Sequence, residues 1–112
     1  MELYEYTAHE LAAMLREKRV SAKEITESVF QRIRAVESMV DAYISLSEES
    51  ALRQAAAVDE KLAAGKTLSP LAGIPVAVKD NICIQGEPTT CASRMLETFR
   101  PPYHAAVTEK LL

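Results

Sequence analysis

Residues 71–82 read LAGIPVAVKDNI and are the most informative stretch of the sequence. After a turn-rich approach, residues 76–79 alternate and predict a short strand. The alternation puts Val76 and Val78 on one face and Lys79 on the other, at the strand end. If this strand end is buried, desolvation favours the neutral amine, which can act as a general base. Lys79 is therefore a candidate catalytic residue, and the alternative is a solvated lysine that snorkels to water.

Upstream of this stretch the chain is predicted to be helical over residues 1–66. Two capping boxes, in which Ser or Thr is followed three residues later by Glu, predict the first two helices. A third helix is predicted to stop at Gly65, the residue type that favours a helix C-terminus. The expected helices lie near 7–18, 21–40 and 48–64.

The second of these helices carries an apolar stripe at helical spacing, which predicts its buried face. The stripe consists of Ile25, Val29, Ile33, Val36 and Val40. Strands are expected near 42–46 and 76–84, and a further helix is expected to begin at Ala106. All five prolines and two of the three glycines lie between residues 69 and 102, so the composition changes after the helical part.

Composition excludes several classes of protein. The chain has 112 residues, of which 48% are hydrophobic and 26% charged, and this balance is that of a globular protein rather than a disordered tail. No apolar run is long enough to span a membrane. The net charge of −3 gives no polybasic surface for nucleic acid. Because the N-terminus lacks the pattern of a signal peptide, a cytoplasmic location is expected.

A second group of candidate side chains lies in the loop at residues 88–93. The hydroxyls of Thr89, Thr90 and Ser93 could orient a substrate, or cap a helix that begins near Ser93. Cys91 could be a nucleophile only with a base beside it, and the sequence places neither histidine there. The spacing of the two cysteines fits neither a CxxC motif nor a zinc site, so both are expected to be reduced thiols and no metal is expected.

Residues 71–82 resemble the lysine motif of the amidase signature family. Residues 86–96, GEPTTCASRML, resemble one branch of it, the A subunits of the aspartyl/glutamyl-tRNA amidotransferases, and residues 99–103 and 107–112 fit the same branch. The resemblance extends over the whole chain but over only the N-terminal quarter of the family's length. It implies a mixed α/β fold in which residues 1–66 are outer helices and residues 67–112 begin a mixed-sheet core.

The same resemblance implies a function. Family members hydrolyse amides with a Ser–Ser–Lys triad, and the lysine of that triad falls on Lys79. In this branch, glutamine is hydrolysed to ammonia, which amidates misacylated glutamyl-tRNA(Gln) or aspartyl-tRNA(Asn). The implied partners are the amidotransferase B and C subunits and, through them, tRNA. ATP and Mg²⁺ are used by the partner subunit, and no cofactor is expected in this chain.

The sequence departs from the family pattern in two ways. The serine-rich segment with the nucleophile lies beyond Leu112, and the last helix has no stop signal, so we expect an excerpt that is inactive alone. His104 stands where the family usually has an acid. Two alternatives remain open: a hydrolase of the same family acting on another small amide, or a small binding protein. The latter would dock a partner on the apolar stripe of the second helix.

Overall fold

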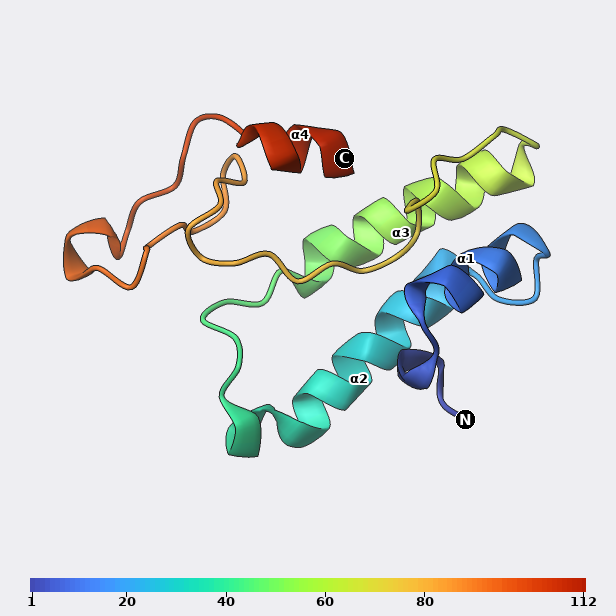
Figure 1. Ribbon diagram of the computed structural model, residues 1–112, viewed down its shortest axis with the longest axis horizontal. Coiled ribbons are helices and arrows are strands. Elements are labelled where there is room, and N and C mark those ends of the chain that lie inside the picture. Colours follow the sequence, from blue (N-terminus) through green and yellow to red (C-terminus); the bar gives the residue numbers. More distant parts are fainter. The chain divides into compact units, whose positions relative to one another are not determined.

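The computed structural model describes residues 1–112, which divide into two compact units, Met1–Pro75 and Val76–Leu112. The first unit contains the long helices and the second is largely irregular (Figure 1). None of the helices combines the length and the apolar character needed to cross a membrane. The elements in chain order are η1 (Leu3–Glu5), α1 (Ala8–Arg16), α2 (Ala22–Val40), α3 (Glu48–Ala63), η2 (Arg94–Leu96) and α4 (Ala106–Leu111).

Helices α1 and α2 begin where the sequence predicts because both capping boxes are complete. The backbone N–H of Glu10 donates to Thr7 Oγ1 at 3.2 Å, and the Thr7 N–H donates to Glu10 Oε2 at 2.8 Å. Ser21 and Glu24 make the same exchange at 3.1 and 2.8 Å. Each box satisfies two N–H groups that have no acceptor inside the helix. Hydrogen bonds from the backbone and then the hydroxyl of Thr7 and Ser21 hold the pKa of Glu10 and Glu24 below its usual value.

Helices α1 and α3 both end in a Schellman motif, which explains where they stop. At the end of α3, the N–H groups of Gly65 and Lys66 donate to the carbonyls of Leu62 and Lys61, as expected for a C-terminal glycine. The end of α1 has the same pattern with Lys18 in the left-handed position, at φ 57°. A lysine holds this conformation at a steric cost that glycine does not have.

The core of the first unit joins all three long helices. Helices α2 and α3 run side by side in opposite directions (Figure 1). Leu15 of α1, Ala22 of α2 and Ala55 of α3 are buried together, and further side chains of α3 pack against them. The small alanine side chains allow the helices to approach closely, so this core is built from little volume.

Gly73 lies in the stretch of residues 71–82, the lysine segment, and packs against this core. Its φ is +81°, and a Cβ added there lies 2.6 Å from Leu15 Cδ2 and 3.1 Å from the Cβ of Ala22. Both the conformation and the space therefore require glycine at this position. Residues 71–75 of the lysine segment are thereby fixed to the helical unit.

The buried face of α2 differs from the predicted stripe. Ile25 and Ile33 are buried as predicted, but Val40 is 60% exposed. Thr26 and Phe30 are buried instead, because η1 and α3 both pack against α2 and cover more than one narrow stripe. Thr26 Oγ1 donates to the Ala22 carbonyl at 2.9 Å, which satisfies its buried hydroxyl. Because Ile25 and Ile33 are covered within this unit, the stripe is not a free docking face for a partner.

The strands expected near 42–46 and 76–84 do not form, and the structure contains no strand. Asp41 ends α2 in the left-handed conformation, and the Tyr43 N–H then donates to Glu37 Oε1 at 2.7 Å. In the second segment, the carbonyl of Lys79 is used in a turn. A strand needs a neighbouring strand for its backbone groups, and this chain supplies none to either segment. The predicted mixed sheet was therefore wrong for these residues taken alone.

The second unit is held by hydrogen bonds between two irregular segments, 83–89 and 99–105, that run in opposite directions. The N–H of Gly86 donates to the Pro101 carbonyl at 3.0 Å, and the N–H of Thr89 donates to the Phe99 carbonyl at 3.1 Å. The carbonyl of Cys83 accepts from the Ala105 N–H and the Thr108 hydroxyl, each at 2.9 Å. These bonds attach α4, which begins at Ala106 as predicted.

Candidate active site

Lys79 lies in a turn of the second unit rather than at the end of a strand. Its carbonyl accepts a hydrogen bond from the N–H of Ile82 at 3.0 Å. Its side chain is exposed, so the burial on which its expected desolvation depended is absent within this chain. The turn fixes the backbone of Lys79 and leaves its amine free to meet another part of a protein.

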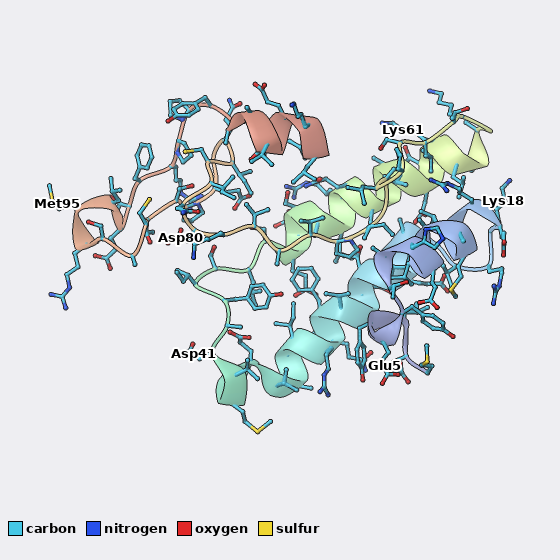
Figure 2. The ribbon with its side chains drawn as sticks, viewed as in Figure 1. Glu5, Lys18, Asp41, Lys61, Asp80 and Met95 are labelled. Carbon is cyan, nitrogen blue, oxygen red and sulfur yellow. The ribbon has the colours of Figure 1, made fainter.

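The residue after Lys79, Asp80, is bonded through both oxygens of its carboxylate. One carboxylate oxygen of Asp80, Oδ1, accepts from the Thr90 N–H at 2.8 Å, and the other, Oδ2, accepts a very short hydrogen bond from the Thr90 hydroxyl. These bonds to Thr90, first from its hydroxyl and then from its N–H, hold the pKa of Asp80 below its usual range. Figure 2 shows Asp80 in the loop of this unit. The sequence analysis did not identify Asp80 as a candidate residue. The only feature of the sequence that could have pointed to it is its position next to Lys79.

The backbone beyond Thr90 is strained. Cys91 and Ala92 both have positive φ, 49° and 57°, which side chains other than glycine rarely adopt. Thr90 Oγ1 accepts from the Ala92 N–H at 3.2 Å, and the Cys91 N–H donates to the Asp80 carbonyl at 2.9 Å. The bonds from Thr90 and Asp80 therefore hold this strained corner in place.

The hydroxyl residues of the loop divide into different roles. Thr90 bonds Asp80, and Ser93 caps η2, because its Oγ accepts from the Met95 N–H at 3.3 Å. The prediction of a cap at Ser93 is thus confirmed, although the helix is a single 3-10 turn. Thr89 is buried, with only 3% of its surface exposed. The structure brings these three side chains to one loop but into no shared cluster.

Neither cysteine is paired with a histidine. Both are free, and Cys91 is exposed. Cys83 Sγ lies 3.9 Å from the Tyr103 hydroxyl, and this hydrogen bond raises the pKa of Tyr103. His104 accepts the Gln85 N–H on its Nδ1 at 3.0 Å, so it fills an acceptor position that a carboxylate could also fill. No group of three His, Cys, Asp or Glu side chains gathers to hold a metal.

Comparison with known proteins gives the family. The amidase family model matches residues 24–112. The chain is 55% identical over 111 residues to the A subunit of the glutamyl-tRNA(Gln) amidotransferase of Desulforudis audaxviator, and 58% identical over 111 residues to that of Desulfosudis oleivorans. Each match covers 99% of this chain and 23% of the relative.

Solved structures agree with this assignment. A chain from "an unexpected vestigial protein complex" that "reveals the evolutionary origins of an s-triazine catabolic enzyme" superposes with a TM-score of 0.89 at 30% identity. The match covers 95% of this chain and 23% of that one, as does its inhibitor-bound form. The N-terminal helices and the lysine segment thus occur together in known proteins about four times longer. The chain belongs to the amidase signature family and spans 23% of the length of the curated relatives that it matches.

Proposed function

We propose that this chain is the N-terminal part of the A subunit of a glutamyl-tRNA amidotransferase, in which Lys79 is the catalytic base. The observation that carries the proposal is 47–58% identity to proteins of that name over 99–100% of this chain, the lysine segment included. Exposure of the Lys79 side chain is consistent with this role, because a base must reach groups that lie elsewhere in the protein.

In the proposed mechanism the neutral amine of Lys79 takes the proton of a bridging serine. That serine takes the proton of the nucleophilic serine, whose oxygen attacks the amide carbonyl of glutamine. The C–N bond breaks, ammonia leaves with a proton returned along the same path, and water then hydrolyses the acyl-enzyme. Both serines would come from sequence after residue 112, so the 112-residue chain by itself hydrolyses no glutamine.

The expected strand at residues 76–78 has a place in this proposal. Residues 76–78 carry Val76, which is 52% exposed here. We propose that this segment joins a mixed sheet in the complete amidase domain, where neighbouring strands supply partners for its backbone groups. Other elements of that domain would then cover both faces of the strand, the apolar face with Val76 and the opposite face with the amine of Lys79, which would be desolvated.

The proposed partners are the B and C subunits, glutamine, and misacylated glutamyl- or aspartyl-tRNA in the cytoplasm. ATP and Mg²⁺ belong to the partner subunit in this proposal.

The test is glutamine hydrolysis by the longer protein that carries this segment, assembled with its partner subunits. Lys79→Ala is expected to lower kcat by at least about 1,000-fold, as loss of the base does in comparable triads. Lys79→Arg is expected to be equally inactive, because a guanidinium does not deprotonate. Lys66→Ala, which removes another exposed lysine, is the matched control and keeps full activity. Glutamine hydrolysis that survives Lys79→Ala contradicts the proposal.

A second candidate is a related hydrolase that acts on a different small amide. The observation in its favour is the TM-score of 0.89 between this chain and a chain of the complex linked to an s-triazine catabolic enzyme. The same Lys79 chemistry serves both candidates, so the substrate separates them. Hydrolysis of a small amide in preference to glutamine, with no amidation of glutamyl-tRNA, would select the second candidate.

A further inference from the structure

We infer that Asp80 and Thr90 form a clamp that positions Lys79 for catalysis. The inference rests on the proposed function and names two positioning residues for it. Neither side chain is assigned a role by the comparisons. Both lie in the second unit, and they are joined by hydrogen bonds over ten positions of sequence.

The clamp joins backbone and side chain at once. Asp80 makes three hydrogen bonds to residues 90–91: two through its carboxylate to Thr90, and one through its carbonyl to the Cys91 N–H. Each of the two donors of Thr90 meets a separate oxygen of one carboxylate. A bidentate arrangement of this kind fixes both the distance and the rotation of the groups that it joins.

The position of the clamp in the chain connects it to Lys79. Asp80 follows Lys79 directly, and the Lys79 carbonyl is held by the Ile82 N–H. The backbone of Lys79 is therefore anchored both at its own carbonyl and through the residue that follows it. A lysine amine stands at the end of four rotatable bonds, so fixing the backbone from which these bonds start limits where the amine can be placed.

The strained corner supports a positioning role. Cys91 and Ala92 stay in left-handed backbone conformations that cost free energy, and Thr90 and Asp80 bond the N–H groups of both. Two consecutive residues are held in this conformation here, whereas Lys18 and Asp41 adopt it singly at helix ends. Strain that is held by a dedicated network is typical of segments whose exact shape serves function.

The Coulomb attraction between Asp80 and Lys79 has a limited part in this picture. Among the influences that lower the pKa of Asp80, the hydrogen bonds from the hydroxyl and N–H of Thr90 come first and the charge of Lys79 comes last. The carboxylate is bonded chiefly to Thr90, so its link to Lys79 runs through the backbone. Asp80 and Thr90 are positioning residues, and neither is expected to touch substrate.

The experiment measures kcat and KM for glutamine in the longer protein with its partner subunits. Thr90→Val keeps the shape of the side chain but removes the hydroxyl, and Asp80→Asn replaces one acceptor oxygen by an amide donor. Each is expected to lower kcat about 10- to 100-fold with KM nearly unchanged, because misplacement of a base by a fraction of an ångström has this effect. Thr90→Ser, which retains the hydroxyl, is expected to restore most of kcat. Thr98→Val makes the same chemical change at an exposed threonine and is the control.

The double variant decides whether the two residues act as one unit. Asp80→Asn with Thr90→Val is expected to lose no more kcat than the worse single variant. Additive losses, an unchanged kcat in both single variants, or a rise in KM alone would overturn the inference. So would variants that fail to fold, because the pair would then support the fold and not the base.

Lys79→Ala, measured in parallel, separates this inference from the proposed function. An inactive Lys79→Ala with fully active Asp80→Asn and Thr90→Val leaves the proposed function standing and removes only the clamp. An active Lys79→Ala removes both.

Discussion

The carboxylate of Asp59 on α3 caps the N-terminus of α2, where its Oδ1 accepts the backbone N–H of Ala22 at 2.7 Å across 37 residues of sequence. Its other oxygen, Oδ2, accepts the N–H of Lys23 at 3.1 Å. The capping box of Ser21 and Glu24 leaves these two donors without a partner, and an anion is favoured there by the helix dipole. The Asp59 side chain therefore joins α3 to α2 by two hydrogen bonds, which no pattern of neighbouring residues in the sequence indicates.

Asp59→Ala should lower the free energy of unfolding by about 1–2 kcal/mol, the usual cost of losing a charged N-terminal cap. Urea unfolding of the 112-residue chain measures the change. Glu60→Ala, at the exposed neighbouring position, is the control and should change stability by less than about 0.5 kcal/mol. Equal losses in the two variants would show that Asp59 is an ordinary surface residue.

Gly73→Ala should be the most destabilising single-methyl change in the chain. The added Cβ meets Leu15 Cδ2 at 2.6 Å and also forces a non-glycine residue to φ +81°. The two effects together should cost about 2–4 kcal/mol.

Gly65→Ala is the matched control for that change, because Gly65 has φ +72° but open space around its Cβ position. It should cost only about 1 kcal/mol, the conformational part alone. The difference between the two urea midpoints isolates the packing against Leu15. If Gly65→Ala is as costly as Gly73→Ala, that packing is not what requires glycine.

Lys18→Gly should stabilise the chain. Lys18 is exposed and holds φ 57° at the end of α1, where glycine carries no steric penalty. The expected gain in the free energy of unfolding is about 0.5–1 kcal/mol. Lys18→Ala removes the same side chain but keeps the strain, so a gain from alanine equal to that from glycine would contradict this explanation.

Stability should fall in acid through the two capping boxes. The pKa values of Glu10 and Glu24 are lowered in the folded chain from an ordinary 4.5, so the unfolded chain binds more protons as the pH falls. The stability that these two carboxylates contribute to the folded chain is complete at a pH above their ordinary pKa. It is lost as the pH drops through their lowered pKa values in the folded chain. Urea midpoints between about pH 7 and pH 3 should therefore decline. The double variant Glu10→Gln with Glu24→Gln should decline less, whereas Glu60→Gln should leave the slope unchanged.

Local interactions explain what was predictable in the fold. The capping boxes at Thr7 and Ser21 and the C-terminal Gly65 act within six residues of sequence, so the helices could be located from the sequence. The strands could not, because a strand requires a partner and the partner is missing from this chain. The prediction of the buried face of α2 was correct only in part. Helical spacing predicts an apolar stripe, but the elements packed against the helix decide how wide the buried face is.

The candidate site shows the same division. Lys79 was identified from the linear pattern of residues 71–82, and the family assignment from that pattern is confirmed. Its catalytic role is still a prediction. Asp80 was missed because its value depends on Thr90, ten positions away, and a hydrogen bond at that separation leaves no periodic signal.

The three long helices, their ends and the family could be read from the linear sequence, because these depend on neighbours along the chain. Three further features depend on contacts between residues that are far apart in sequence. Asp59 caps α2 from another helix, Gly73 seats against Leu15, and Thr90 clamps Asp80 beside the proposed base. Each of these contacts joins groups that folding alone brings together, since backbone donors and side-chain volumes must be satisfied in three dimensions whatever their spacing in sequence.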